Sequence, residues 1–166
     1  MTNSPGSRRS RGRLWTISNA GKLKTVITKS AEETIELGRK IGALLRPNEV
    51  IALIGDLGAG KTTLCQGIAH GVGVKDYVTS PTFIIINEHA GRLPFFHIDL
   101  YRLENLDEIE ELGIEEYFSR GGVCLIEWAE RMWKLLPATA EKIEIEMKGE
   151  NERKICVSSG LAARLK

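Results

Sequence analysis

Apolar residues recur along the chain with two different spacings, which separate predicted strands from predicted helices. Alternation over residues 23–28 and a continuous apolar run over 50–54 predict two strands. Between them, Ser30 and Glu33 have the spacing of a capping box, and apolar residues then follow at one-face helical spacing up to Leu45. A proline two residues later favours the end of the helix there.

The rest of the chain continues this alternation of element types. The further predicted elements, in chain order, are a helix over 61–70, strands over 83–88 and 93–99, helical turns over 105–112 and 114–118, a strand over 123–126, a short helix over 130–135, and strands over 143–147 and 155–157. Short turns separate the strands 83–88 and 93–99, and likewise the strands 143–147 and 155–157. Each of these two pairs is therefore expected to form a hairpin. We therefore predict an α/β fold with a mixed, mainly parallel sheet flanked by helices and a C-terminal β-hairpin.

Length and charge indicate which residues form the folded domain. The 166 residues favour one domain. The net charge is only +1, yet residues 1–24 carry six Lys and Arg and no acidic residue, so the remainder is mildly acidic. We expect residues 1–22 to form a disordered basic leader, residues 23–160 the folded domain, and residues 161–166 a tail.

Composition also argues against several classes of protein. No apolar stretch approaches the roughly 18 residues of a membrane-spanning helix, and the basic leader lacks the apolar region of a secretion signal. Cys65, Cys124 and Cys156 are widely separated, and the three histidines lack metal-ligand spacing. We therefore expect free thiols in a reducing compartment, no zinc site, no membrane partner and a cytoplasmic location.

A glycine-rich segment after the strand at 50–54 carries the clearest chemical signal. It fits the phosphate-loop pattern G-x-x-x-x-G-K-[ST] at every fixed position, with the residues Gly55, Asp56, Leu57, Gly58, Ala59, Gly60, Lys61 and Thr62. Glycines let the backbone N–H groups turn inward, and the start of the following helix adds partial positive charge. Lys61 is expected to reach the β- and γ-phosphates and the Thr62 hydroxyl to ligate Mg²⁺.

Two acidic residues close apolar strands at the edge where such sheets bind ligands. Glu127 follows the strand at 123–126, and Asp99 ends the strand at 93–99. Either could hold Mg²⁺ or could be a solvated charge at a strand end. The hydroxyl-rich segment 79–82 could sense the γ-phosphate or simply form a turn. No Asn-Lys-x-Asp guanine motif occurs, which favours ATP over GTP.

Several short segments, in this order and at these distances, together resemble the TsaE family. They are the phosphate loop with Thr63, Ser-Pro-Thr-Phe at 80–83, His-Ile-Asp-Leu-Tyr-Arg-Leu at 97–103, Leu-Gly-Ile at 112–114 with Tyr-Phe at 117–118, and Ile-Glu-Trp-Ala-Glu-Arg at 126–131. The resemblance extends from about residue 24 to residue 157. It implies a P-loop ATPase of tRNA threonylcarbamoyladenosine synthesis, and the basic leader departs from the family's usual beginning.

The resemblance also implies a role for individual residues. Lys61 and Asp99 would serve hydrolysis, and Thr62 and Glu127 would hold Mg²⁺. The nucleotide-binding set would comprise Gly55, Asp56, Leu57, Gly58, Ala59, Gly60, Lys61, Thr62 and Thr63, with Ser30, Thr82, Trp128 and Arg153. Ser30 and Arg153 would lie on the adenine side.

The implied activity is ATP binding and hydrolysis, weak in the isolated chain, in support of a partner enzyme. The family acts with TsaD and TsaB, which form threonylcarbamoyladenosine at position 37 of tRNAs that read codons beginning with adenine. The chain would reset that pair between turnovers and would meet tRNA only through the complex. Two alternatives stay open: a small-molecule or nucleotide kinase, and a non-catalytic adaptor controlled by nucleotide.

Overall fold

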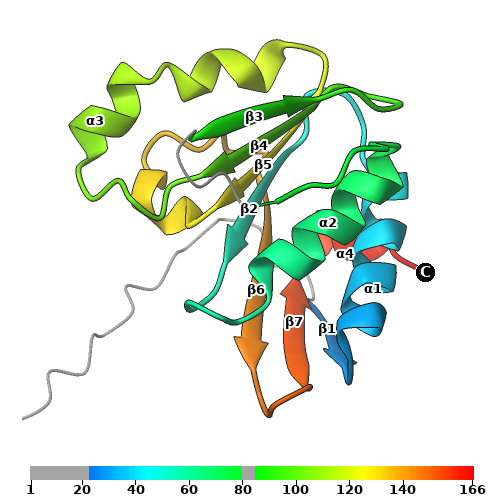
Figure 1. Ribbon diagram of the computed structural model, residues 1–166. Helices are drawn as coiled ribbons and strands as arrows, with labels where there is room; N and C mark the ends of the chain where they lie inside the picture. Colours follow the sequence, from blue (N-terminus) through cyan, green and yellow to red (C-terminus); the bar gives the residue numbers. More distant parts are fainter. Residues whose placement is uncertain (1–22, 80–84) are drawn as a thin grey trace, which may run out of the picture.

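The computed structural model describes residues 23–79 and 85–166, which form three layers with a sheet in the middle (Figure 1). Within these residues the sheet has seven strands in the order β1-β7-β6-β2-β5-β4-β3. The strands are β1 (Lys24–Thr28), β2 (Val50–Ile54), β3 (Ile86–His89), β4 (Phe95–Asp99), β5 (Val123–Glu127), β6 (Glu141–Met147) and β7 (Arg153–Val157). The helical segments are α1 (Ala31–Leu44), α2 (Lys61–Val72), α3 (Leu106–Glu111), the 3₁₀ helices η1 (Ile114–Ser119) and η2 (Ala129–Met132), and α4 (Ser159–Arg164).

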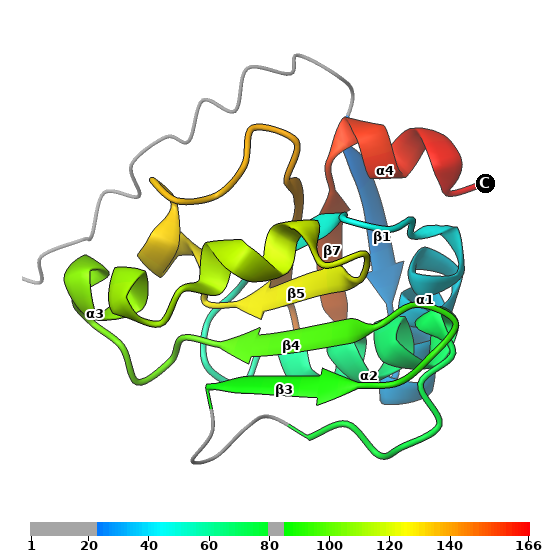
Figure 2. The same ribbon diagram turned by 90° about the horizontal axis from the view of Figure 1, so that it is seen from above.

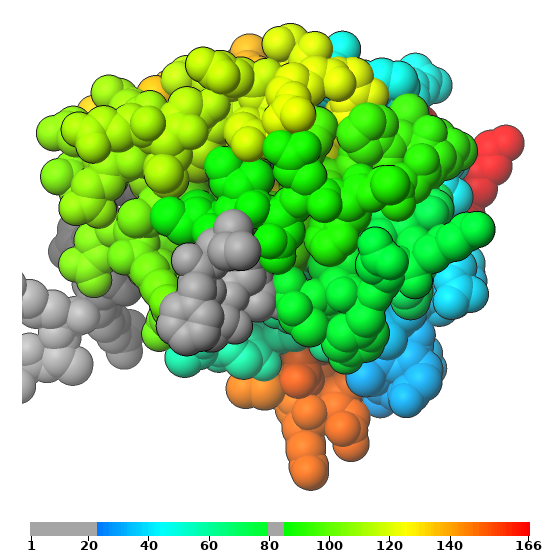
Figure 3. Space-filling view, turned by 45° about the horizontal axis from the view of Figure 1, so that its top comes forward, coloured from blue at the N-terminus to red at the C-terminus, as the bar shows by residue number. Residues whose placement is uncertain are grey.

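Strand directions confirm the predicted mixed sheet. The central strands β6, β2, β5 and β4 run parallel to one another. The hairpin partners β3 and β7 run antiparallel to β4 and β6, and β7 also pairs antiparallel with β1. Figure 2 shows β5, β4 and β3 side by side at one end of the sheet, and Figure 3 shows the turn of the β6–β7 hairpin projecting from the body.

Each face of the sheet has its own apolar core. One core lies between the sheet and α1, α2 and α4, and the other lies beneath α3, η1 and η2. Alternation along β5 divides the strand between them, because Val123 and Leu125 belong to the first core while Cys124 and Ile126 belong to the second. Glu127 continues the first series and therefore faces the α2 side.

Helices α1 and α2 pack with their backbones in contact. A Cβ atom built on Gly42 would lie 2.1 Å from the carbonyl oxygen of Ile68, and one on Gly71 would lie 2.2 Å from that of Arg39. The same holds one turn earlier for Gly38 and its neighbours in α2. Glycine at these positions therefore sets the distance between the two helices, and through α2 the position of the phosphate loop.

The first helix begins as the capping pattern predicts. The Ser30 hydroxyl accepts a hydrogen bond of 3.1 Å from the Glu33 N–H, and the Glu33 carboxylate accepts one of 2.7 Å from the Lys29 N–H. The carboxylate thus reaches the residue before the cap and not the cap itself. This arrangement holds the end of β1 close to the start of α1.

Two segments differ in form from the sequence-based expectations. The short helix expected over 130–135 is the 3₁₀ helix η2, which ends at Met132. The segment expected as a tail, 161–166, belongs largely to α4, where Leu161 and Leu165 are buried. The Lys24 ammonium donates a 2.6 Å hydrogen bond to the Leu165 carbonyl, so the end of the chain is tied to β1. None of the helices in the described ranges is both long and apolar enough to cross a membrane.

Candidate nucleotide-binding site

The phosphate loop joins the end of β2 to the start of α2. Gly58 and Gly60 have φ angles of +77° and +100°, a region that side chains strongly disfavour, so the loop requires glycine there. Gly60 is also the N-cap of α2 and supplies no capping side chain. The first backbone N–H groups of α2 therefore meet no capping oxygen from the N-cap residue, which suits them to an anion.

Lys61 is the first residue of α2 and is buried within the loop. Its ammonium donates hydrogen bonds to the carbonyl oxygens of Gly55 (2.6 Å) and Asp56 (2.8 Å) and lies 4.1 Å from the centre of the Trp128 ring. Burial lowers the pKa of Lys61, while nearby carboxylates, Glu127 foremost, oppose that shift. The loop carbonyls thus hold the lysine ammonium close to several carboxylates.

Two predicted acidic residues meet at the ends of neighbouring parallel strands. Asp99 of β4 is the register partner of Glu127 of β5, and Leu53 of β2 pairs with Glu127 from the other side. Glu127 is buried, and its Oε1 lies 2.8 Å from Nε2 of the fully buried His97. The strand that leads into the phosphate loop therefore lies beside the strand that carries Glu127.

Asp99 is partly buried, and its surroundings disfavour the charged form of its carboxyl group. Burial raises the pKa of Asp99, the nearby Glu127 charge adds to that effect, and a 2.9 Å hydrogen bond from the Tyr101 N–H to Oδ1 counteracts it. A carboxylate with a raised pKa is a better proton acceptor than a solvated one. Asp99 therefore has the electrostatic character of a group that can orient or deprotonate water.

Three neighbouring buried side chains, Glu127 among them, carry atoms of the kinds that bind metal ions. The candidate ligand atoms of Cys65, His97 and Glu127 all lie within 4.8 Å of one another. Burial raises the pKa of the Cys65 thiol well above its ordinary value, and the charges of Glu127 and Asp99 reinforce the shift. A neutral thiol is a poor ligand, and the 2.8 Å contact between His97 and Glu127 has hydrogen-bond length.

Oxygen donors are the better fit for a metal in this region. The Glu127 carboxylate and the Thr62 hydroxyl are hard ligands of the kind that Mg²⁺ prefers. Beside them, Gly58 and Gly60 take positive φ angles that favour glycine and let backbone N–H groups turn towards a phosphate. The residues present are therefore compatible with a Mg²⁺–triphosphate group.

Trp128 links the strand end to the loop. Its φ angle of +58° is unusual for a bulky residue and turns the chain sharply from β5 into η2. The centre of its ring lies 5.1 Å from the centre of the Tyr101 ring. The guanidinium carbon of Arg131 lies 5.4 Å from the same ring centre. The structure thus places Trp128 at the Lys61 ammonium, within an aromatic and cationic cluster.

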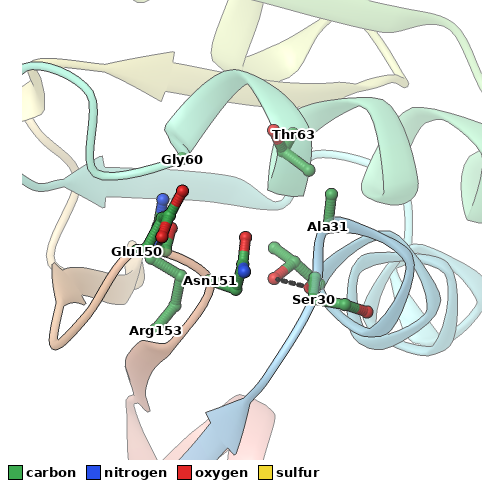
Figure 4. Close-up of a pocket in the computed structure, with 8 residues that line it drawn as sticks. Ser30, Ala31, Gly60, Thr63, Glu150, Asn151 and Arg153 are labelled. Carbon is green, nitrogen blue, oxygen red and sulfur yellow. Dashed lines mark hydrogen bonds between the residues drawn. The ribbon is translucent and has the colours of Figure 1, made fainter.

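A pocket on the other side of the loop brings together residues that are far apart in the sequence (Figure 4). Ser30 and Ala31 at the start of α1, Gly60 and Thr63 of the loop and α2, and Arg153 of β7 all border it, with Thr34, Glu150 and Asn151. The Arg153 guanidinium donates hydrogen bonds to carbonyls of the β6–β7 turn, Gly149 among them at 3.0 Å. Both residues expected on the adenine side therefore line one pocket beside the phosphate loop.

Other residues of the site were either not expected or cannot be placed. Thr82, expected in the switch-like segment, lies outside the described residues. His97 and Glu130 were not predicted as site residues, although both belong to segments quoted for the resemblance. One Glu130 oxygen is buried without a hydrogen-bond partner within 23–79 and 85–166, and burial raises the pKa of this carboxyl. His97 could have been predicted from the sequence, because it lies two residues before Asp99 on one strand and therefore on the same face of the sheet.

Taken together, the strand–loop–helix unit and the parallel strands around it define an α/β protein of the P-loop class. Comparison with known proteins narrows this class. Residues 28–155 match the model of the family "Threonylcarbamoyl adenosine biosynthesis protein TsaE". This chain belongs to the TsaE family.

Individual relatives agree with this assignment. The tRNA threonylcarbamoyladenosine biosynthesis protein TsaE of Bacillus subtilis is 46% identical over 129 residues, covering 77% of this chain and 80% of that protein. The TsaE protein of Treponema pallidum is 37% identical over 132 residues, covering 80% and 98%. The crystal structure of YdiB from Bacillus subtilis superposes with a TM-score of 0.72 at 37% identity, covering 89% of this chain and 97% of that one.

Proposed function

We propose that this chain is the ATP-binding and ATP-hydrolysing subunit required for threonylcarbamoyladenosine formation at position 37 of tRNAs that read codons beginning with adenine. It acts with TsaD and TsaB, resets that pair between turnovers and meets tRNA through the complex. The observation that carries the proposal is the convergence of Lys61, Glu127 and Asp99 at a phosphate loop in a chain of the TsaE family.

The phosphate loop and Lys61 bind the triphosphate. The Lys61 ammonium donates to the loop carbonyls of Gly55 and Asp56, and phosphate oxygens replace these acceptors when ATP enters. The backbone N–H groups at the start of α2 supply further donors. Ser30 and Arg153 border the pocket beside the loop and contact the adenosine end of the nucleotide.

Thr62 and Glu127 hold Mg²⁺, which when bound neutralises charge on the β- and γ-phosphates. Asp99 stands next to Glu127 in the register of the sheet and orients the attacking water. The raised pKa of Asp99 increases its capacity to take a proton from that water. Hydrolysis by the isolated chain is slow in this proposal, and it accelerates when the partner complex supplies a charge-stabilising group in trans.

Trp128 is expected to transmit the effect of nucleotide binding to the surface that the partner contacts. The centre of the Trp128 ring lies 4.1 Å from the Lys61 ammonium and 5.1 Å from the centre of the Tyr101 ring. Drawing the ammonium towards phosphate oxygens changes this contact, and η2 follows directly after Trp128. A surface built from these elements therefore differs between nucleotide states, as resetting of a partner complex requires.

Nucleotide binding is tested by thermal unfolding with Mg-ATP. At about 100 times the dissociation constant, the ligand adds roughly 2.7 kcal/mol to the free energy of unfolding of the wild type. For a domain of this size that corresponds to a rise in Tm of roughly 5–11 °C. Lys61→Ala and Thr62→Ala are expected to lose this protection. Equal protection of the Lys61 variant would contradict the assigned phosphate site.

The function itself is tested by reconstitution with TsaD and TsaB, tRNA, ATP and the threonylcarbamoyl donor. Many modified tRNAs per TsaD are expected with the wild-type chain, and about one or fewer with Asp99→Asn, although that variant still binds nucleotide. Unchanged modification with Asp99→Asn would remove Asp99 from the mechanism. Turnover that instead accelerates strongly with one small metabolite would support a kinase, and partner binding without hydrolysis would support an adaptor.

A further inference from the structure

His97 lies deep beneath the proposed metal ligand and has no part in the function described so far. It belongs to β4, and its side chain is fully buried on the face that carries Phe95 and packs against α2. A buried polar ring is costly unless it is hydrogen-bonded. Apolar packing alone therefore does not explain a histidine at this position.

The sheet register explains which group His97 meets. His97 pairs with Leu125 and Asp99 pairs with Glu127, so His97 and Glu127 are diagonal neighbours across β4 and β5. Nε2 of His97 lies 2.8 Å from Oε1 of Glu127. Because Glu127 offers only acceptors when ionised, the proton of this hydrogen bond belongs to Nε2.

The other ring nitrogen indicates that this contact alone orients the ring. Nδ1 is buried and has no hydrogen-bond partner within the parts of the chain that the structure describes. The opposite tautomer would place a lone pair of Nε2 against the carboxylate and lose the bond. The Nε2–H group is therefore committed to one oxygen of Glu127, and the other oxygen stays available as a ligand.

We propose that His97 is a positioning residue, which fixes the Glu127 carboxylate so that Oε2 binds Mg²⁺. Carboxylates that ligate metal ions are commonly held by such an outer hydrogen bond, whose removal typically costs about 10–100-fold in metal affinity. The hydrogen bond also lowers the cost of burying the Glu127 charge. The inference rests on the proposed function, because it takes Glu127 as the metal ligand.

The test measures metal affinity separately from nucleotide affinity. Mn²⁺ is titrated into the full chain saturated with the ATP analogue adenylyl imidodiphosphate, and unbound Mn²⁺ is followed by its electron paramagnetic resonance signal. His97→Phe keeps ring volume and removes the donor, so Mn²⁺ affinity is expected to fall about 10–100-fold. Affinity for the analogue in excess EDTA is expected to stay within about threefold of wild type, since His97 makes no contact with the loop in the proposal.

Two amide variants distinguish positioning from general stabilisation. The amide nitrogen of His97→Gln can occupy the place of Nε2 and restore most of the metal affinity, whereas the shorter His97→Asn cannot. His89→Asn in the neighbouring strand β3 is the matched control and is expected to leave Mn²⁺ affinity unchanged. If His97→Phe does not fold, the Gln and Asn variants decide the question between them.

The outcomes separate this inference from the proposed function. Wild-type affinity for Mn²⁺ in folded His97→Phe, or equal affinity of the Gln and Asn variants, would overturn the positioning role and leave nucleotide binding intact. A wild-type chain that binds neither the analogue nor Mn²⁺ would instead overturn the proposed function.

Discussion

The close contact between α1 and α2 leads to a sharp prediction for Gly42→Ala. A Cβ atom at this position would lie 2.1 Å from the Ile68 carbonyl oxygen and 2.9 Å from the Cα atom of Gly71. Both obstacles are backbone atoms, so no side-chain rotation can relieve the overlap. The two helices must move apart, and the interior on the α2 side of the sheet loses packing.

The size of the effect follows from two opposing contributions. Overpacking of a tight interior costs typically 1–3 kcal/mol, and two backbone overlaps place this site at the upper end. Alanine is favoured over glycine within a helix by about 1 kcal/mol. The net loss is about 2 kcal/mol, which lowers Tm by roughly 4–8 °C for a domain of this size.

The assay is thermal unfolding of the full chain, with and without Mg-ATP. Gly149→Ala is the matched control, because a Cβ atom there would lie 3.8 Å from the Glu152 Cβ, an ordinary contact. Its Tm is expected to stay within about 1–2 °C of wild type. Because α2 begins at Lys61, Gly42→Ala is also expected to weaken ATP protection. A Tm at or above the wild-type value would refute the proposed helix contact.

Two further predictions concern groups buried near the site. At pH 8, native Cys65 and Cys124 are expected to resist iodoacetamide, because both are buried and burial raises the pKa of Cys124 to about 12 and that of Cys65 well above its ordinary value. The partly exposed Cys156 should react first by peptide mass spectrometry, and equal modification of Cys65 would contradict its burial. Burial also raises the folded-state pKa of Glu130, so the folded chain binds this proton more tightly than the unfolded chain, and stability falls as pH rises through the interval above the ordinary carboxyl value of 4.5. Glu130→Gln is therefore expected to raise Tm at pH 7.5 and to raise it less as pH approaches 4.5, and a Tm gain independent of pH would contradict this account.

Local patterns predicted most of the elements, because their signals lie within a few residues. The cap at Ser30, the phosphate loop and the alternating strands of the last hairpin depend on contacts between neighbours in the sequence. The helix at the end of the chain gave no such signal. Its order depends on distant partners, such as the Arg164 guanidinium donating to the Leu44 carbonyl at 3.1 Å.

The site was predicted only in part for the same reason. Motif spacing predicted Lys61 and the two strand-terminal acids as site residues, but it did not predict that β4 and β5 lie side by side. The His97–Glu127 hydrogen bond depends on that adjacency and on a diagonal register. Likewise, Ser30 and Arg153 meet at one pocket only because β7 lies between β6 and β1 in the sheet.

In the proposed function, a triphosphate and its divalent cation bind between the phosphate loop and Glu127. Isothermal titration calorimetry of ATP, with Mg²⁺ and with excess EDTA, tests it directly on wild type and Glu127→Gln, which keeps the shape of the side chain and removes its charge. We expect both proteins to bind metal-free ATP with equal affinity. The increase in affinity that Mg²⁺ provides is expected to be at least roughly tenfold smaller for Glu127→Gln. An undiminished gain from Mg²⁺ in Glu127→Gln would contradict it.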